Sequence, residues 1–332
     1  MKRNIMILLL LSLAGVVQAK TPIGIVIHGG AGTISRESMT PAQEQAYHAM
    51  LQHAVNQGYA VLERGGSSLD AVSAAVMVLE DSPLFNAGKG AVYTFDEKHE
   101  LDASIMDGQS RNAGAVAGVT TVKNPILLAR AVMEKSAHVM LSGKGAEQFA
   151  VEQKLEQVEN SYFNTEFRYD ALKKAKQALS PQPHQAYQAY DPAWKMGTVG
   201  AVAVDRNGNL AAATSTGGMT AKRYGRIGDA PVIGAGNFAD NQCAVSATGH
   251  GEFFIRYQVA ADICARARYL KIPVADAAHK VIAELKQHGG DGGVIVADNK
   301  GRLSWAFNSQ GMYRAYKAEG RDTVSEIFRT QD

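Results

Sequence analysis

Two segments in the second half of the chain, each made of two short apolar runs around a polar turn, constrain the fold more than any other feature. Residues 199–214 place an Asn-Gly turn between two runs of Val and Ala, and residues 293–307 repeat this order around Asn-Lys-Gly. Such turns between apolar runs indicate antiparallel hairpins. Helical spacing of apolar residues lies between them, at about 254–269 and 274–288. Grouped hairpins and grouped helices predict an α+β fold, with packed antiparallel sheets and helices outside.

The first half of the chain begins with an apolar strand and a long helix. Residues 23–27 are mostly β-branched and lead into the glycine-rich segment 28–32, which predicts a buried strand ending in a tight loop. A Thr-Pro-Ala-Gln start and a Gly-Gly end predict a helix from 41 to about 64. Further helices are expected at about 69–79, 126–134 and 145–151, and further strands at about 91–94, 103–107 and 115–120.

The apolar pattern fades between residues 153 and 197. Within this stretch, residues 180–190 are polar, contain two prolines and show no period. A segment of this composition does not bury enough apolar surface to fold by itself. We therefore predict a flexible tail or linker over residues 153–197, ending where Gly197-Thr198 meets the next strand.

The N-terminus has the three parts of an export signal. Lys2 and Arg3 precede the apolar residues 5–17, and small residues follow up to Ala19. The apolar run is short for a transmembrane helix. We predict that residues 1–19 are a cleaved signal peptide and that the mature protein is periplasmic, without a membrane anchor.

Composition excludes some partners. The 34 basic and 32 acidic residues leave a net charge of +2, which gives no reason to expect nucleic acid as a partner. Hydrophobic residues make up 46% of the chain, which excludes a mostly disordered protein and allows a large core.

Two cysteines, Cys243 and Cys264, are present. They could pair in an exported protein. Because a core of this size needs no covalent cross-link, we expect each to be a buried free thiol instead.

Hydroxyl groups, glycines and one pair of opposite charges gather just after expected strand ends. They lie at Gly197-Thr198, at 214–218, at 226–229 and at 248–252. Taken singly, each has an ordinary interpretation as a strand hydroxyl, a turn residue or a surface ion pair. Together they suit acyl transfer, which needs a nucleophile, hydrogen-bond donors for an oxyanion and charged groups that hold the substrate.

The order and spacing of these motifs resemble the plant-type L-asparaginases, also called isoaspartyl peptidases, among the N-terminal nucleophile hydrolases. The resemblance runs over nearly the whole mature chain. It implies a four-layer αββα sandwich, formed as one folded domain. It also implies hydrolysis of small substrates, β-aspartyl dipeptides and the side-chain amide of L-asparagine. The segments that carry it are 28–32, 84–88, 100–103, 106–108, 197–200, 215–218, 225–229 and 248–252.

The resemblance further implies self-cleavage between Gly197 and Thr198. The products would be an alpha subunit, residues 20–197, and a beta subunit, residues 198–332, assembled as a dimer of such pairs. Gly197 would allow a strained turn at the cleavage point. The freed α-amine of Thr198 would titrate at about 7.7–8.0, so that near neutral pH it could accept the proton of its own hydroxyl.

Further catalytic roles follow from the resemblance. Thr216 would hydrogen-bond the nucleophile Thr198. Thr248 and the Gly249 N–H would form the oxyanion hole. Asn86 would position the nucleophile or the leaving group.

A second set of residues would recognise the substrate. Arg226 would bind the substrate α-carboxylate, and Asp229 would bind the α-ammonium group. The full set implied by the resemblance is Arg226, Ile227, Gly228, Asp229, Thr248, Gly249, His250 and Gly251. His28, despite its glycine-rich surroundings, is expected to be structural, because the family uses no catalytic histidine.

No organic cofactor is expected, and the one ion that the resemblance implies is a structural Na⁺ held by backbone carbonyls, which suit a hard cation. Its ligands would be Leu79, Glu80, Ser82, Phe85, Ala87 and Lys89.

Two other functions remain open from the sequence. A glycosylasparaginase-like amidase of the same superfamily would usually carry Asp in place of Gly197. A periplasmic amino-acid-binding protein without activity would keep Arg226 and Asp229 but would have no need for Gly197-Thr198.

Overall fold

The computed structural model describes residues 21–179 and 197–329. The predicted signal peptide lies outside the described residues, as do residues 180–196 of the predicted linker. Among the described residues, no helix is long and apolar enough to cross a membrane.

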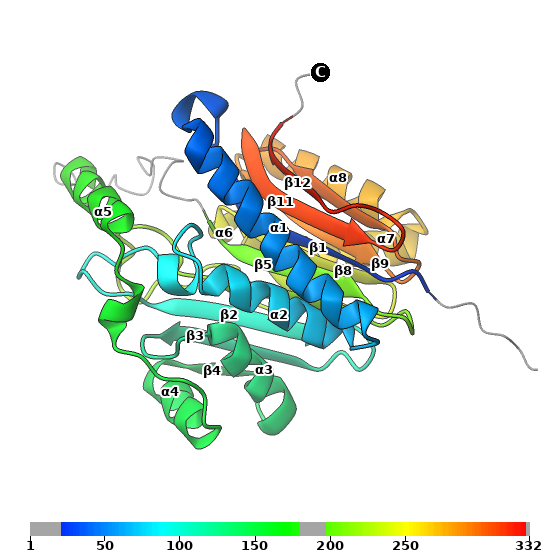
Figure 1. The fold of residues 1–332 in the computed structure, drawn as a ribbon, viewed down its shortest axis with the longest axis horizontal. Coiled ribbons are helices and arrows are strands. Elements are labelled where there is room, and N and C mark those ends of the chain that lie inside the picture. The colour runs from blue at the N-terminus through cyan, green and yellow to red at the C-terminus, as the bar shows by residue number, and fades with distance from the viewer. Residues whose placement is uncertain (1–20, 180–196, 330–332) are drawn as a thin grey trace, which may run out of the picture.

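The described strands form two sheets (Figure 1). The large sheet has eight strands in the order β12-β11-β1-β5-β6-β2-β3-β4, and the small sheet has four in the order β10-β9-β8-β7. Only the β3–β4 pair is parallel among these neighbours. The strands are β1 Gly24–Gly32, β2 Leu101–Asp107, β3 Ala113–Val119, β4 Met140–Ser142, β5 Val199–Val204, β6 Leu210–Thr216, β7 Asn237–Ala239, β8 Cys243–Gly249, β9 Gly292–Asp298, β10 Leu303–Phe307, β11 Gly311–Ala318 and β12 Val324–Phe328.

Helices cover the outer face of each sheet, which confirms the predicted four-layer αββα sandwich. Helices α1 (Pro41–Glu63), α2 (Ser68–Glu80) and α3 (Pro125–Lys135) pack on the large sheet, and α7 (Val259–Leu270) and α8 (Val274–Gln287) pack on the small one. The inner faces of the sheets meet through β1, β5 and β6 against β8 and β9. The remaining α-helices are α4 Gly143–Glu152, α5 Glu166–Leu179 and α6 Gly251–Tyr257.

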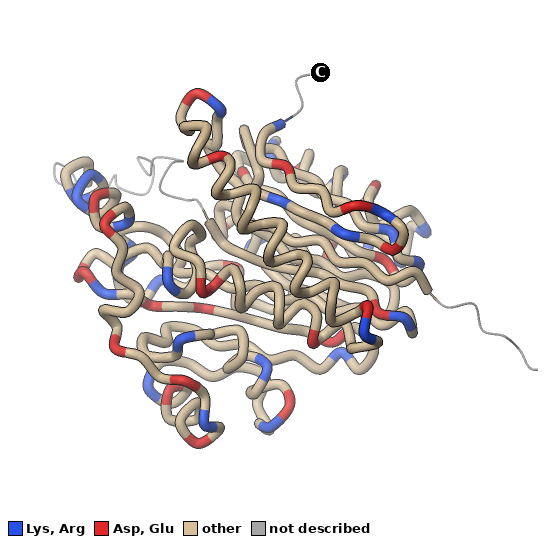
Figure 2. The backbone as a smooth tube through the Cα atoms, viewed as in Figure 1, with Lys and Arg blue, Asp and Glu red and all other residues tan. Residues whose placement is uncertain are grey.

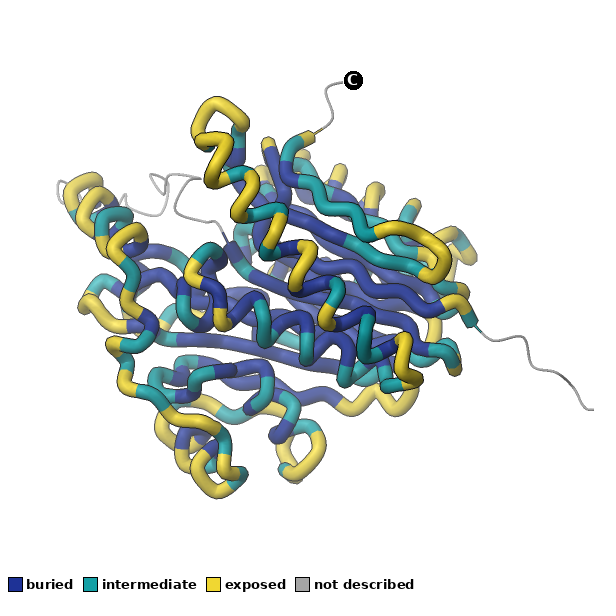
Figure 3. The backbone as a smooth tube through the Cα atoms, viewed as in Figure 1, coloured by how far each residue is buried: buried dark blue, intermediate teal, exposed yellow. Residues whose placement is uncertain are grey.

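Strand β1 is buried on both faces because it lies inside the sandwich. Ile25 and Ile27 belong to the core beneath α1 and α2, whereas Val26 belongs to the core between the sheets. This alternation is the period of two that any strand imposes on its side chains. Figure 3 shows these central strands buried and the outer turns of the helices exposed. Charges of both signs are interspersed over the outer elements, as Figure 2 shows.

The ends of α1 and α2 follow from their sequences. The hydroxyl of Thr40 accepts a hydrogen bond from the Gln43 N–H, and the Gln43 side chain accepts one from the Thr40 N–H, forming a capping box. Ser67 caps α2 in a similar way, by accepting from the Asp70 N–H. The chain leaves α1 through Gly65, whose φ of +82° a glycine adopts without strain.

Three predictions about secondary structure are wrong. Residues 91–94 form no strand, apart from one isolated bridge at Thr94. The helix predicted over 254–269 breaks at Gln258, whose φ of +49° separates α6 from α7. The strands β4, β7, β8, β11 and β12 were not predicted, because they are short or carry polar residues that hide their period.

The prediction of a flexible linker over 153–197 is also wrong up to residue 179. This part contains a 3₁₀ turn, Asn160–Phe163, and helix α5. Leu172 and Leu179 of α5 pack in a small apolar cluster with Tyr93. The helix is polar on average, so its stability depends on the packing of its apolar face against this cluster.

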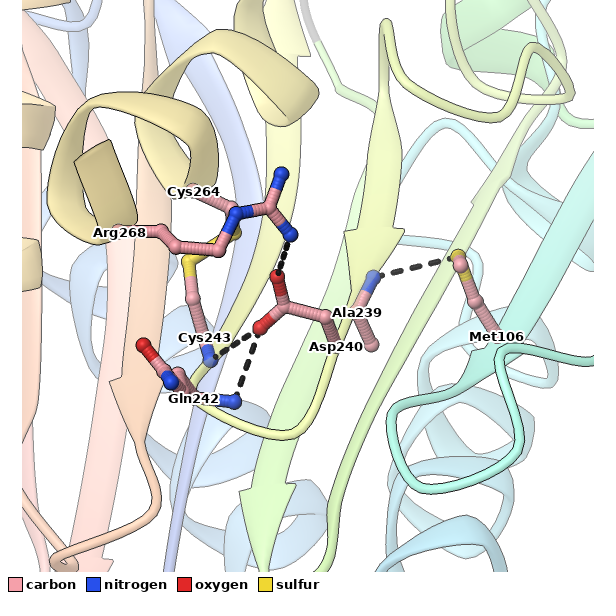
Figure 4. The surroundings of a disulfide bond; sticks show 7 residues. All are labelled: Met106, Ala239, Asp240, Gln242, Cys243, Cys264 and Arg268. Carbon is pink, nitrogen blue, oxygen red and sulfur yellow. Dashed lines mark hydrogen bonds and ion pairs between the residues drawn. A yellow bond between two sulfur atoms is a disulfide. The ribbon is translucent and has the colours of Figure 1, made fainter.

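The two cysteines form a disulfide, contrary to the expected free thiols. Cys243 lies at the start of β8 and Cys264 in α7, with their Cα atoms 5.5 Å apart (Figure 4). Both are buried, and Asp240 beside them accepts hydrogen bonds from the backbone N–H groups of Gln242 and Cys243. The packing of α7 on the small sheet creates this pairing distance, which the sequence separation alone does not reveal.

Candidate active site

The junction Gly197-Thr198 lies directly before β5 and is packed from both sides. Gly197 has φ +124°, and a Cβ added there would lie 2.4 Å from the Cβ of Asn86. A Cβ added at Gly30, on the other side, would lie 2.5 Å from the Cα of Gly197. Both the backbone conformation and the space therefore require glycine at position 197.

The hydroxyl of Thr198 is directed at Thr216, at the end of the neighbouring strand β6. Thr198 Oγ1 donates to Thr216 Oγ1 at 3.1 Å, and the Gly218 N–H donates to the same oxygen at 3.0 Å. Thr216 is buried. Its hydroxyl is therefore held in place by the turn that follows β6, and it fixes the direction of the Thr198 side chain.

Asn86 holds this junction together. Its Nδ2 donates to the Gly218 carbonyl at 2.7 Å, and its Oδ1 accepts from the Val92 N–H at 2.9 Å. Its backbone N–H donates to the Gly197 carbonyl oxygen at 3.1 Å, and its own carbonyl accepts from the Gly217 N–H. The structure thus places Asn86 beside the Gly197-Thr198 junction, with its side-chain amide hydrogen-bonded to Gly218 and Val92.

Thr248 and Gly249 end strand β8 of the small sheet. Thr248 is buried, and its Oγ1 accepts from the Ala31 N–H at 3.3 Å. Ala31 follows Gly30, the residue packed on Gly197, so Thr248 and the Thr198 junction meet the same glycine-rich segment. Gly249 has φ +148°, and a Cβ there would lie 2.4 Å from the Asp291 carbonyl oxygen.

A second cluster of charged side chains follows β8. Arg226 Nε and Nη2 donate to the two oxygens of Glu252 at 3.0 and 2.9 Å, and His250 Nε2 lies 3.3 Å from Glu252 Oε2. A Cβ at Gly251 would lie 2.8 Å from Asp229 Oδ1 and 2.9 Å from Arg226 Nη2. The glycine therefore lets Arg226, Asp229 and Glu252 converge on one spot.

Sequence reasoning missed Glu252, although it lies inside the motif at 248–252. It accepts from two of the five N–H groups of Arg226, the residue predicted to bind the substrate carboxylate. Burial raises the pKa of Glu252, but hydrogen bonds from His250 and Arg226 outweigh this effect and hold it well below its usual range. Glu252 is therefore charged at neutral pH and forms an ion pair with Arg226.

Asp229 is a buried carboxyl with an unused oxygen. Burial raises its pKa to about 7, and the charge of Arg226 only partly opposes this. Among the described residues, Asp229 Oδ2 has no hydrogen-bond partner. A buried acceptor in this state calls for a donor, and a cationic ammonium group would both bind it and favour its ionised form. Of the other predicted contacts, Ile227 is exposed, and Gly228 lies close to Arg226 Nη1.

In the segment around residues 79–89, two of the backbone carbonyls predicted to bind Na⁺ lie close to glycines. A Cβ at Gly88 would lie 2.3 Å from the Glu80 carbonyl oxygen, and one at Gly90 would lie 2.2 Å from that of Phe85. Two of the predicted ligand oxygens therefore point into the space that these glycines leave free. The Glu80 carboxyl instead accepts from the Ser215 hydroxyl at 2.6 Å, and burial raises its pKa to about 8. No group of three or more acidic, His or Cys side chains that could hold a metal occurs among the described residues.

Comparison with known proteins identifies the family to which the chain belongs. A family model described as "Asparaginase" matches residues 20–326. The chain is 50% identical to the isoaspartyl peptidase of Escherichia coli (strain K12), over 92% of this chain and 96% of that protein. It is 40% identical to the isoaspartyl peptidase/L-asparaginase of Homo sapiens, over 90% and 94% of the two chains. It is 42% identical to the probable isoaspartyl peptidase/L-asparaginase 2 of Arabidopsis thaliana, over 89% and 95%. With matches of this extent, the chain belongs to the asparaginase family of N-terminal nucleophile hydrolases.

Proposed function

We propose that the protein is an isoaspartyl peptidase and L-asparaginase that uses Thr198 as its nucleophile. The observation that carries the proposal is the Thr198 hydroxyl, held 3.1 Å from Thr216 directly after a glycine junction. The names of the relatives support the choice of substrates, β-aspartyl dipeptides and L-asparagine. The glycosylasparaginase-like and binding-protein alternatives are not favoured by these relatives.

Self-cleavage comes first in the proposed mechanism. Thr198 Oγ attacks the carbonyl carbon of Gly197, an ester forms, and the peptide C–N bond breaks as the hydroxyl proton passes to the freed amine. Water then hydrolyses the ester, which leaves a carboxylate on Gly197 and restores the Thr198 hydroxyl. The Asn86 N–H, 3.1 Å from the Gly197 carbonyl oxygen, would stabilise the negative charge that develops there.

Turnover uses the same hydroxyl and the new amine. The amine of Thr198 accepts the hydroxyl proton, and Oγ attacks the side-chain carbonyl of the aspartyl group. Thr248 and the Gly249 N–H stabilise the oxyanion, and the leaving group departs as ammonia or as the amine of the second amino acid. Water then releases aspartate from the acyl-enzyme.

Substrate recognition falls to the charged cluster after β8. Asp229 Oδ2 would accept from the substrate ammonium group, and Arg226 would bind the α-carboxylate. Since Glu252 accepts from Nε and Nη2 of Arg226, the substrate would bind the remaining N–H groups of the guanidinium or share this contact. Gly228 and Gly251 leave room close to these groups.

Further parts of the proposal concern assembly and location. The two subunits, 20–197 and 198–332, would form one folded domain, since β1 pairs with β5 and β11, and β2 pairs with β6. Two such pairs would assemble into a heterotetramer in the periplasm, after removal of residues 1–19. A structural Na⁺ would lie in the carbonyl loop at 79–89, and no organic cofactor would take part.

The test uses Thr198→Ala, with Thr121→Ala as a matched control. Thr121 is a surface threonine whose hydroxyl bonds only the Gln157 side chain among the described contacts. We expect wild type and Thr121→Ala to yield two fragments, one starting at Thr198, and to hydrolyse a β-aspartyl dipeptide. Thr198→Ala should stay intact and inactive. An active Thr198→Ala protein would refute the proposal, and wild-type release of aspartate only from a glycosylated asparagine would favour the rival amidase.

A further inference from the structure

A buried chain of polar side chains lies behind Thr198 and is used by no step above. His28 Nδ1 lies 2.9 Å from the Thr198 carbonyl oxygen, and its Nε2 lies 2.9 Å from Ser246 Oγ. Ser246 Oγ lies 2.7 Å from Thr214 Oγ1, which accepts from Asn237 Nδ2 at 3.3 Å. All four side chains are buried. They come from β1, β8, β6 and β7, and so connect both sheets.

The hydrogen on His28 can be placed by its partners. A carbonyl oxygen only accepts hydrogen bonds, so Nδ1 must carry a hydrogen. Complete burial lowers the pKa of His28 to about 3, although the bond to Thr198 opposes this, so the ring is neutral at pH 7. Nε2 therefore carries no hydrogen and accepts one from the Ser246 hydroxyl.

The rest of the chain then runs in one direction. Ser246 has used its single hydrogen, so the 2.7 Å contact to Thr214 needs the hydrogen of Thr214. Thr214 Oγ1 also donates to the Gly236 carbonyl at 3.0 Å, so its single hydrogen is shared between Gly236 and Ser246. Thr214 in turn accepts from Asn237. The order of donation is therefore Asn237 to Thr214 to Ser246 to His28, and from His28 to the carbonyl of Thr198.

We propose that His28 is a positioning residue for the nucleophile: the chain from Asn237 through Ser246 holds the Nδ1–H tautomer, and Nδ1–H holds the Thr198 carbonyl. The proposal rests on the function proposed above for Thr198. Once Gly197 is cleaved off, Thr198 is bonded to the protein only through its carbonyl side. The β1–β5 pairing ends at His28 and Gly200, so no backbone hydrogen bond of this ladder reaches the Thr198 carbonyl. The His28 side chain supplies that hydrogen bond instead.

Gly200 gives independent support for this arrangement. A Cβ at Gly200 would lie 2.0 Å from Ser246 Oγ and 2.5 Å from His28 Nε2. The contact between His28 and Ser246 therefore exists only because the residue opposite His28 in the sheet has no side chain. The three atoms nearest to this position are Ser246 Oγ, His28 Nε2 and the Ala213 carbonyl oxygen.

Matched variants of His28 test the role of Nδ1. The side-chain amide of His28→Asn can occupy the place of Nδ1, and that of His28→Gln the place of Nε2. We expect His28→Asn to keep kcat within about threefold of wild type, and His28→Gln and His28→Ala to lose about tenfold to a hundredfold, as for a nucleophile displaced by a fraction of an ångström. KM should change by less than about twofold, because the lost interaction acts on the nucleophile and not on the bound substrate. Rates are taken per chain with a free Thr198 terminus, counted by mass.

A second measurement does not depend on activity. The ¹⁵N shifts of the His28 ring, identified by their loss in His28→Asn, should show a protonated Nδ1 and an unprotonated Nε2 at neutral pH. Ser246→Ala, which removes one oxygen, should shift this ring toward the other tautomer and lower kcat in the same sense as His28→Gln.

Two results would overturn the proposal. One is an Nε2–H or a charged ring in the wild type. The other is a kcat for folded His28→Gln equal to that of His28→Asn. Failure of the proposed function would show separately, as activity in Thr198→Ala, and would leave the tautomer measurement unchanged.

Discussion

The contact between Gly197 and Asn86 leads to a sharp prediction for self-cleavage. In Gly197→Ala, the new methyl carbon would lie 2.4 Å from Asn86 Cβ and 2.9 Å from the Asn86 backbone nitrogen. Carbon atoms pack at about 3.5–4.0 Å, so the junction or Asn86 must move by about 1 Å. The φ of +124° at residue 197 adds backbone strain of about 1–3 kcal/mol for any residue that has a Cβ.

Such a movement should slow self-cleavage strongly. The Thr198 hydroxyl must attack the Gly197 carbonyl carbon directly, and a misplacement of about 1 Å at a reacting centre costs about a hundredfold in rate. The Asn86 N–H on the Gly197 carbonyl would also be displaced. The assay is intact-mass spectrometry of freshly purified precursor over time, with Thr198→Ala as the uncleaved reference. We expect Gly197→Ala to cleave at least about a hundredfold more slowly than wild type.

Gly320→Ala is the matched control. Gly320 also has a positive φ, +71°, but a Cβ there would meet no atom within 4 Å. It should cleave at the wild-type rate. Equal rates for Gly197→Ala and wild type would refute the argument from the contact. Equal slowing of both variants would point to a general loss of stability, and not to the contact with Asn86.

Three further predictions concern stability and substrate binding. Replacing Cys243 and Cys264 by Ala should lower the free energy of unfolding by about 3 kcal/mol, because the disulfide closes a loop of 21 residues; urea denaturation without reductant measures this, and an unchanged midpoint would contradict it. The pKa of Asp229, raised to about 7 by burial, is above its unfolded value, so its contribution to stability is present below about pH 4 and is lost as pH rises through 7. Urea midpoints at pH 5 and pH 8 should show this loss in wild type, and Asp229→Asn should show a smaller one, since buried Glu80, whose pKa is raised to about 8, still contributes. Arg226→Gln should raise KM for a β-aspartyl dipeptide by about tenfold to a hundredfold, because one charge-assisted hydrogen bond to the substrate is lost, and kcat should change much less. An unchanged KM would show that Glu252, rather than substrate, is the partner of Arg226.

Much of the secondary structure is readable from local sequence. The capping box at Thr40, the Asn-Gly turn after Asp205 and the strand at 23–27 all depend on neighbours within a few residues. Local signals fail where a distant partner decides the outcome. Helix α5 is polar on average and is stabilised through a face that packs on Tyr93, far away in the chain.

The candidate site divides in the same way. Gly197-Thr198, Thr216 and Thr248 can be selected from the sequence through the resemblance to the asparaginase family, whose motifs occur here in order. The contact of Arg226 with Glu252 and the chain from His28 to Asn237 cannot, because each depends on atoms that meet only when the strands pack. The same holds for the disulfide, whose partners are brought within 5.5 Å by α7 on the small sheet.

The sequence by itself therefore determined the α+β class, through apolar periods and short-range turns, and pointed to the candidate site hydroxyls and Gly197 through its family resemblance. The tertiary structure alone decided the order of strands, the partner of each charged group and the tautomer of His28. Strand pairing and side-chain contacts between residues 170 or more positions apart, such as His28 with Thr198, depend on burial and close packing of the whole chain, which local sequence does not encode.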